Sequence, residues 1–146
     1  MKTLEYKIDI AADRRKVWDT MLQPETYKEW TAVSWPGSGY DGKWAQGEDI
    51  KFVSPEGGGT KAHIDQLKPY ESMLATHVAV IQSDGSEDTS SDIAKGWVGT
   101  KEQYFFDETD GTTNLLVRIE TTPEWASMFD EGWPAALKKL KEISEN

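Results

Sequence analysis

Glu102 and Tyr104 are the residues whose types and spacing come closest to acid–base chemistry. They are two positions apart in an alternating segment, so they share one face of a predicted strand. The same face carries Val98, Thr100 and Phe106. If that face points inward, a buried carboxylate with a raised pKa can act as general acid or base, and a tyrosine can polarise a carbonyl. Because buried polar residues more often anchor a ligand than catalyse, the two are weak catalytic candidates.

The two histidines are candidates for a metal pair with a neighbouring carboxylate. His63 and Asp65 flank Ile64 and share a strand face, while His77 belongs to a later strand. Zinc needs ligands that converge, but the alternation places His63 and Asp65 opposite Ile64, on the outer face. The face of His77 stays open, because residues 73–81 are largely apolar on both sides. We therefore expect ordinary surface or edge histidines and no metal site.

The chain offers no other catalytic or cofactor motif. It contains no cysteine, which excludes a thiolate nucleophile and favours a reducing compartment, the cytoplasm. Segment 57–61 lacks the spacing of a phosphate-binding loop, and the acidic run from Asp84 lacks the ligand pattern of a calcium loop. No serine lies in a nucleophile-elbow pattern. We therefore expect no cofactor, and catalysis is the less favoured alternative.

Charge and composition limit the classes of molecule that the protein can bind. The chain has 26 acidic and 16 basic residues, and its formal net charge of −10 would repel nucleic acid and anionic membranes alike. It contains no apolar run long enough for a signal peptide or a membrane span. Seven tryptophans, five tyrosines and four phenylalanines supply large rigid apolar surfaces, either as core or as an aromatic-lined interior. We expect neither nucleic acid nor membrane as partner, and a monomer or weak dimer.

Periodicity predicts the elements that position these residues. Alternation from Leu4 to Ile10 predicts a strand, and Asp13 is a helix N-cap for a segment that Pro24 interrupts. A second short helix follows from Pro24 to Trp30. Segment 34–47 is loop and hairpin material, in which Asp41-Gly42 favours a tight turn.

The rest of the chain alternates between strands and turns. A strand around Ile50 and Phe52 ends at Pro55 and the flexible run 57–59, and the next strand carries Ala62, Ile64 and Gln66 on one face before Pro69. Three more strands are predicted, over residues 73–81, 97–107 and 114–121. Between them, the polar segment 83–92 is predicted as a mobile surface loop and Asp110-Gly111 as a hairpin turn.

The last strand and the C-terminal helix carry the clearest apolar faces. Leu115, Val117 and Ile119 face one way, while Arg118 faces outward as a surface ion-pair partner. After Thr122-Pro123, an apolar stripe at helical spacing predicts an amphipathic helix that buries Trp125, Phe129, Trp133, Ala136, Leu137 and Leu140. Gly132 and Pro134 predict a kink or a restart within it.

This order of elements predicts the α+β class. Residues 1–146 form one domain, in which a curved antiparallel sheet of about six or seven strands surrounds the long C-terminal helix, with two short helices after the first strand. The sheet must bury its apolar face, and only the last helix is long enough to cover it. Whether Trp125, Phe129 and Trp133 line a void or fill it is left open.

Short motifs along nearly the whole chain follow one another in a distinctive order. They are Val17-Trp18, the run from Pro24 to Trp30, Gly42-Lys43-Trp44, the run from Gly47 to Phe52, Ile64, Pro69, the run from Glu102 to Phe105, Gly111-Thr112-Thr113, Gly132-Trp133, Leu137 and Leu140. In order and spacing they resemble the START-related SRPBCC superfamily of helix-grip proteins. Within it, the chain is similar to the stand-alone branch related to the activator of the heat-shock-protein-90 ATPase.

The resemblance implies a cavity between sheet and helix. Across relatives such a cavity binds lipids, sterols or aromatic polyketides, and in some of them it catalyses cyclisation. Other relatives only recruit a protein partner. The heat-shock relatives carry an additional N-terminal domain that these 146 residues lack, which argues against a co-chaperone role. Binding of a small hydrophobic or aromatic molecule is thus the leading hypothesis. One alternative is a cyclase- or hydrolase-type enzyme that uses the same cavity. The other is a protein-interaction module, which exposed Trp35 and Trp97 would indicate. The expected ligand-binding residues are Trp44, Phe52, Ile64, Tyr104, Val117, Ile119, Trp125, Phe129 and Trp133.

Overall fold

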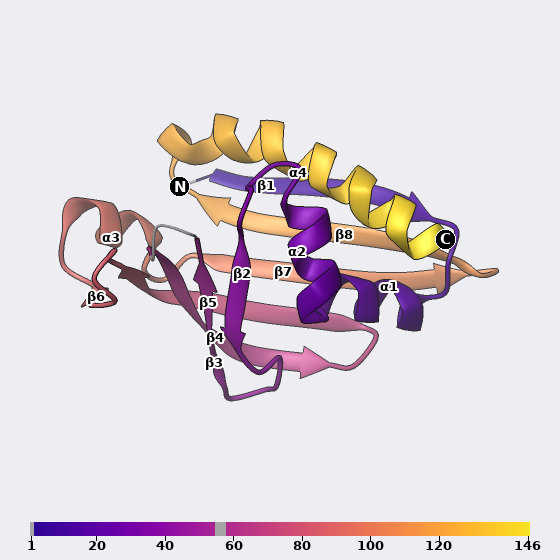
Figure 1. Cartoon of the computed structure of the whole chain (residues 1–146), viewed down its shortest axis with the longest axis horizontal. Coiled ribbons are helices and arrows are strands. Elements are labelled where there is room, and N and C mark those ends of the chain that lie inside the picture. Colours follow the sequence, from indigo (N-terminus) through magenta and orange to yellow (C-terminus); the bar gives the residue numbers. More distant parts are fainter. Residues whose placement is uncertain (1, 55–57) are drawn as a thin grey trace.

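An antiparallel sheet packed against one long helix forms the framework of the protein (Figure 1). The computed structural model describes residues 2–54 and 58–146. Over these residues the strand order is β1-β8-β7-β5-β4-β3-β2, and the short β6 pairs with β5. The predicted α+β helix-grip architecture is confirmed, with seven strands along the main path and β6 as an eighth.

The elements have the following bounds, in chain order: β1 Lys2–Ile10, α1 Arg14–Leu22, α2 Pro24–Thr31, β2 Gly39–Gly42, β3 Asp49–Val53, β4 Gly59–Lys68, β5 Ser72–Ile81, β6 Glu87–Asp88, α3 Asp92–Trp97, β7 Lys101–Thr109, β8 Thr112–Thr121 and α4 Pro123–Glu145. The predicted cap of α1 is confirmed, because the Asp13 carboxylate accepts a hydrogen bond from the Lys16 amide at 2.8 Å. The predicted strand end at Pro55 and the glycine at position 57 lie outside the described residues.

The helix α4 covers the inner face of the sheet. Figure 1 shows it lying along β1 and β8, with α1 and α2 beside it. It runs through Gly132 and Pro134 as one continuous helix, so the restart predicted there is not seen. Pro134 cannot donate a backbone hydrogen bond, but the apolar face of the helix, which includes Trp133, packs in the core on both sides of it and keeps the helix continuous. The Ser34 hydroxyl donates to the Gly132 carbonyl at 2.6 Å.

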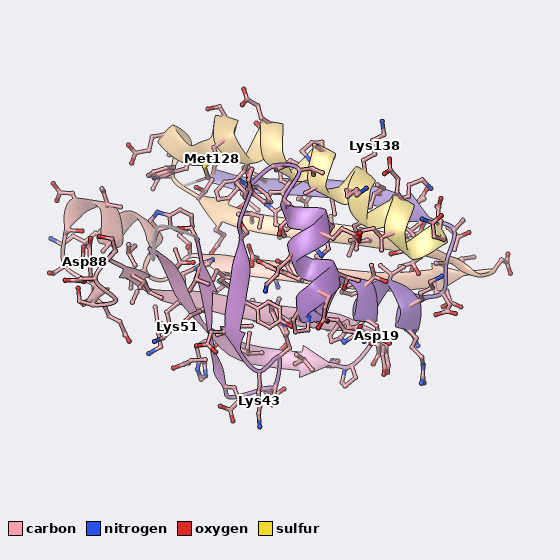
Figure 2. The ribbon with its side chains drawn as sticks, in the orientation of Figure 1. Asp19, Lys43, Lys51, Asp88, Met128 and Lys138 are labelled. Atoms are coloured by element: carbon pink, nitrogen blue, oxygen red, sulfur yellow. The ribbon has the colours of Figure 1, made fainter. Side chains whose placement is uncertain are left out.

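The inner face of the sheet follows the predicted alternation. Leu115, Val117 and Ile119 are buried on β8, and their register partners on β7 are Phe106, Tyr104 and Glu102. On the outer face, Arg118 makes an ion pair with Glu5 at 2.8 Å, as a surface partner of the kind predicted. Charged side chains such as Lys43 and Lys138 point outward (Figure 2).

The segment before β7 differs from the prediction. Residues 97–100 were expected to begin a strand, but Trp97 is the last residue of α3 and β7 begins at Lys101. The Ser91 side chain caps α3 by accepting from the Ala94 amide at 3.1 Å, and Gly99 turns the chain with a φ of 90°. Val98 therefore lies in a turn with 39% of its surface exposed. Within the predicted loop 83–92, residues 87–88 pair with β5 as β6.

Gly59 shows why a glycine opens β4. A Cβ at this position would overlap with the carbonyl oxygen of Phe52 on the neighbouring strand β3. The close approach of the two backbones therefore requires glycine. Residue 59 belongs to the strand, although the sequence pattern had placed it in a flexible run. In the described part of the chain, no helix is long and apolar enough to cross a membrane.

Candidate functional site

A cavity of about 170 Å³ lies between the inner face of the sheet and the helices α2 and α4. Eight of its fourteen lining residues are tryptophan, tyrosine or phenylalanine, so its wall is largely aromatic. The lining residues are Tyr27, Trp30, Thr31, Trp35, Ser38, Phe52, Thr60, His77, Trp97, Glu102, Tyr104, Ile119, Phe129 and Trp133.

Trp133 on α4 is at the centre of the aromatic wall. Its ring centroid lies 5.9 Å from that of Trp30, 5.6 Å from Trp35 and 6.1 Å from Tyr104. The planes of Trp35 and Tyr104 are tilted by 72° and 63° to that of Trp133, so these pairs are edge-to-face. The indole Nε1 of Trp133 is buried and has no hydrogen-bond partner among the described residues.

Glu102 and Tyr104 form a hydrogen-bonded pair in the cavity wall. The Tyr104 hydroxyl donates to the Glu102 carboxylate at 2.9 Å. Burial raises the pKa of Glu102 to about 7, although the hydrogen bond from Tyr104 acts to lower it. Glu102 is half-buried and lines the cavity. No described cationic side chain makes an ion pair with this carboxylate.

Tyr27 on α2 faces the same carboxylate from the opposite layer. Burial raises its pKa well above the usual value, and the negative charge of Glu102 raises it further. Its ring packs edge-to-face on Trp30 at 5.3 Å and on Tyr40 at 5.0 Å between centroids. Burial and the charge of Glu102 likewise raise the pKa of Tyr104. Both tyrosines are therefore neutral hydrogen-bonding groups near neutral pH.

His77 lies inside the molecule, which corrects the expectation of an ordinary surface or edge histidine. Its ring packs between Phe52 and Trp97, with centroids 6.3 Å and 5.5 Å away. Burial lowers the pKa of His77 to about 4, so the imidazole is neutral at pH 7. Its Nδ1 atom is buried without a hydrogen-bond partner in the described structure. The sequence missed this orientation because both faces of β5 are largely apolar.

His63 and Asp65, the other two candidate metal ligands, lie on the outer face of the sheet. His63 contacts Asp49 through Nδ1 at 2.8 Å, and Asp65 accepts a hydrogen bond from Thr76. Neither residue lines the cavity that contains His77. Within the described ranges, no three histidine or acidic side chains gather as a metal site would require.

The structure brings together five of the nine residues expected to bind a ligand. These five line the cavity: Phe52, Tyr104, Ile119, Phe129 and Trp133. Ile64 and Val117 are fully buried in the packed core instead. Trp44 packs on Tyr40 and Phe52, and Trp125 packs on Trp97. Phe129 and Trp133 therefore line a void, whereas Trp125 and Trp44 support residues that do.

Sequence reasoning did not assign the contribution of α2 and of the segment after it. Tyr27, Trp30 and Thr31 lie at helical spacing on one face of α2, which is a signal that could have found them. Trp35 and Trp97 are half-buried in the cavity wall, so this pair does not form the exposed patch that would indicate a protein-interaction module.

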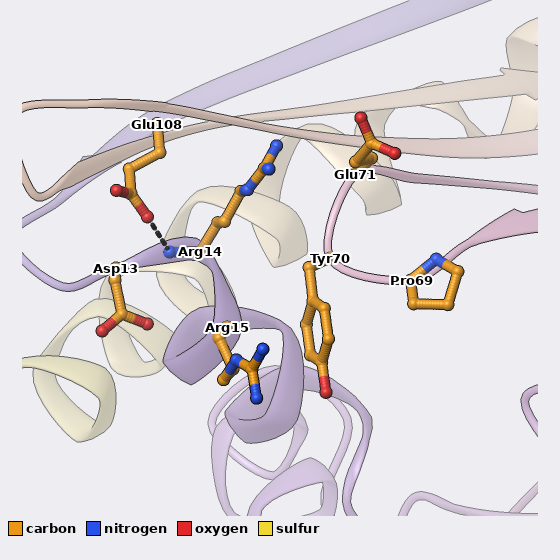
Figure 3. Close-up of a pocket in the computed structure, with 7 residues that line it drawn as sticks. All are labelled: Asp13, Arg14, Arg15, Pro69, Tyr70, Glu71 and Glu108. Carbon is orange, nitrogen blue, oxygen red and sulfur yellow. Dashed lines mark hydrogen bonds between the residues drawn. The ribbon is translucent and has the colours of Figure 1, made fainter.

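A second hollow, of about 310 Å³, lies at the start of α1 (Figure 3). The Arg14 amide donates to Glu108 at 2.8 Å, and the Arg15 guanidinium lies 4.7 Å from the ring centre of Tyr70. Its lining contains two arginines and three acidic residues, among them Asp13 and Glu71. It is a mixed-charge surface hollow without a buried, unpaired polar atom, so the aromatic cavity is the stronger candidate site.

The antiparallel sheet, the two short helices after its first strand, the long C-terminal helix and the cavity between them define a helix-grip protein of the SRPBCC superfamily. Residues 11–145 match the family described as Activator of Hsp90 ATPase homolog 1-like protein, and the chain belongs to this family. No curated protein sequence matches the chain significantly.

Solved structures with the same fold cover nearly the whole chain. Protein MLL2253 from Mesorhizobium loti is 16% identical with a TM-score of 0.76, and the match covers 97% of this chain and 96% of that one. The Aha1 dimer from Colwellia psychrerythraea is 21% identical with a TM-score of 0.69, over 99% and 97% of the two chains. Protein Ms6760 from Mycobacterium smegmatis is 17% identical with a TM-score of 0.68, over 97% and 89%. At these identities the likeness shows the fold.

Proposed function

We propose that the protein binds a small aromatic or hydrophobic molecule in the cavity between the sheet and α4. The main support for this proposal is the cavity itself, which combines a mostly aromatic wall with the polar groups of Glu102, Tyr104 and His77. Ligand sites in proteins are typically apolar with a few convergent polar groups. The family's fold is consistent with a cavity of this kind.

The volume limits the ligand. An apolar cavity of roughly 150 Å³ holds a benzene molecule. The 170 Å³ found here therefore suit one aromatic ring with a short substituent. The buried Nδ1 of His77 and Nε1 of Trp133, which lack partners among the described residues, offer hydrogen bonds to such a substituent.

Benzyl alcohol tests this proposal as a neutral ligand of the right size. We expect a saturable change in tryptophan fluorescence and a one-to-one complex in native mass spectrometry, because four tryptophans line the cavity. Ile119→Phe fills part of the cavity and should weaken binding, whereas Ile93→Phe, at a position 61% exposed, should leave it unchanged. A wild-type protein without saturable binding, or equal binding by the Ile119→Phe variant, would contradict the proposal.

Acid–base catalysis is a second candidate because Glu102 and Tyr104 both line the cavity and contact each other. A carboxyl group with a pKa of about 7 is half-protonated at neutral pH, which suits a general acid or base. A reaction would be indicated by ligand turnover that Glu102→Gln abolishes while binding persists.

We further propose that the protein is a monomer or weak dimer in the cytoplasm. The Colwellia relative is described as a dimer, and a chain without cysteine suits a reducing compartment. Light scattering over a concentration series tests the oligomeric state.

A further inference from the structure

We propose that the ligand of the aromatic cavity is an organic cation, a small aromatic amine whose ammonium group lies against the Glu102 carboxylate. This inference rests on the proposed function, because it requires that the cavity binds a ligand. It deepens that function by naming the charge of the ligand. Three features of the cavity and the net charge of the chain support it.

The first feature is an acid without a counter-charge. Glu102 lines the cavity, and its one side-chain hydrogen bond comes from the neutral Tyr104 hydroxyl at 2.9 Å. None of the fourteen lining residues, all of them described, is lysine or arginine. A carboxylate in a low-dielectric site is costly unless it is paired. A ligand cation would supply the partner that the described chain does not.

The second feature is the aromatic wall. Trp30, Trp35, Trp97 and Trp133 line the cavity together with Tyr27 and Phe52. The negative faces of aromatic rings attract cations, tryptophan most strongly, and several rings around one acid form the kind of cage that recognises ammonium groups. The rings here lie in different planes, since Trp97 is tilted by 75° to Phe129 and Trp35 by 72° to Trp133. Rings in several planes enclose a volume from more than one side.

The third feature is the set of titratable groups that face Glu102. Tyr27, Tyr104 and His77 line the same cavity, and each is neutral near pH 7, so none of them balances the acid. His77 lies on β5, diagonal to Glu102 across the β5–β7 register, in which Ala75 is opposite Glu102. Its unpaired Nδ1 atom is available to accept a hydrogen bond from an ammonium group.

The fourth feature is the charge of the whole chain. A formal net charge of −10 raises the local concentration of cations and lowers that of anions. A carboxylate ligand would meet both this field and Glu102, so the same cavity should exclude anions of equal size. A neutral alcohol would donate a hydrogen bond to Glu102 but would leave the charge unbalanced.

Three ligands of nearly equal size separate these cases. Benzylamine, benzyl alcohol and benzoate differ in one substituent and carry a positive, zero and negative charge at about pH 8, where Glu102 is mostly ionised. By isothermal titration calorimetry we expect benzylamine to bind about tenfold more tightly than benzyl alcohol, and benzoate not to bind. In Glu102→Gln, benzylamine should lose about tenfold in affinity while benzyl alcohol stays within about twofold. Glu48→Gln removes an equal charge at an exposed site and should change neither.

The binding results separate the proposed charge of the ligand from the proposed function. Equal affinities of benzylamine and benzyl alcohol in the wild-type protein, or equal losses of affinity for both in Glu102→Gln, would contradict the proposal that the ligand is a cation. Either result would leave the proposed function intact. Saturable binding of none of the three would overturn both. The ligand series in the wild-type protein needs no variant, so the inference is tested even if Glu102→Gln folds poorly.

Discussion

His77 and Glu102 lie on neighbouring strands, β5 and β7, and burial shifts the pKa of each toward its uncharged form. The pKa of His77 falls to about 4 and that of Glu102 rises to about 7. At neutral pH the imidazole is therefore neutral and the carboxyl group is near its midpoint. The cavity wall can exchange a proton at Glu102 under conditions in which its histidine cannot.

The pKa of His77 makes folding stability depend on pH. The unfolded chain binds a proton with a pKa near 6.5 and the folded chain only near 4, so stability is lost as the pH falls through this window. Relative to His77→Phe, the wild-type protein should lose about 2 kcal/mol of unfolding free energy between about pH 7 and pH 5. Urea unfolding at both pH values measures the difference, and a difference that does not change with pH would contradict buried, neutral His77.

Glu102 should show the opposite sign in the same experiment. Its pKa is about 7 in the folded chain and near 4.5 in the unfolded chain, so the folded state binds more protons between these values. Relative to Glu102→Gln, the wild-type protein should gain stability as the pH falls from about 7 to about 4.5. A loss over this range would show that the carboxyl group is not buried as described.

The alternation of the sequence placed Glu102 and Tyr104 on one face of a strand without deciding whether that face points inward, and it left the face of His77 open. Glu102, Tyr104 and Phe106 alternate with Gln103, Phe105 and Asp107, so the period of two groups the first three on one face. The β5 segment is apolar on both faces, and a pattern without contrast cannot show which residues point inward. Pairing with the neighbouring strands decided the matter.

At the scale of elements, α4 fixes the shape of the cavity through its contact with the segment that follows α2. Gly132 packs directly against the Trp35 ring, and a Cβ at this position would lie 2.5 Å from Cζ2 of Trp35. The glycine that sequence reasoning took for a helix interruption therefore allows a tryptophan to approach the helix. Trp35 is held in the cavity wall by this close approach.

Gly132→Ala should destabilise the protein and disturb the cavity. Alanine favours the helix by about 1 kcal/mol, but the rigid Trp35 ring must move, at a cost of about 1–3 kcal/mol, so we expect a net loss of up to about 2 kcal/mol. Thermal unfolding measures the loss, and altered tryptophan fluorescence reports the displaced ring. In Gly96→Ala, where the nearest atom is a Thr122 methyl group at 3.3 Å, the loss should be much smaller. Equal effects of the two substitutions would contradict a special role for Gly132.

At the scale of the whole molecule, excess negative charge acts against compactness. With 26 acidic and 16 basic residues, we expect repulsion among surface carboxylates to outweigh attraction in ion pairs such as that of Arg118 with Glu5. The same field supports selection of cations by the cavity. The charge excess concerns partners and solubility and has no part in choosing the fold.

Salt should therefore stabilise the protein at neutral pH. Raising NaCl from about 20 to about 200 mM shortens the Debye length from roughly 20 Å to roughly 7 Å and screens the repulsion. We expect the free energy of unfolding to rise by about 0.5–1 kcal/mol, the size typical of surface charge effects. At about pH 4.5, protonation of carboxyl groups removes most of the net charge and the salt effect should vanish. A lower stability in high salt at neutral pH would show that attractive pairs dominate.

The sequence by itself determined the class of fold, the order of the longer elements and the inner faces of β1, β8 and α4, but it did not predict the helix α3 or the short strand β6. Period-two and helical spacing are local patterns with strong contrast in these segments, as in Leu115 to Ile119. The tertiary structure decided the rest. It made Trp97 the end of a helix, turned His77 inward, and brought Tyr27, Trp35 and Glu102 from separate elements to one cavity. A void exists only where side chains far apart in the chain fail to fill a space, and no local pattern contains that information.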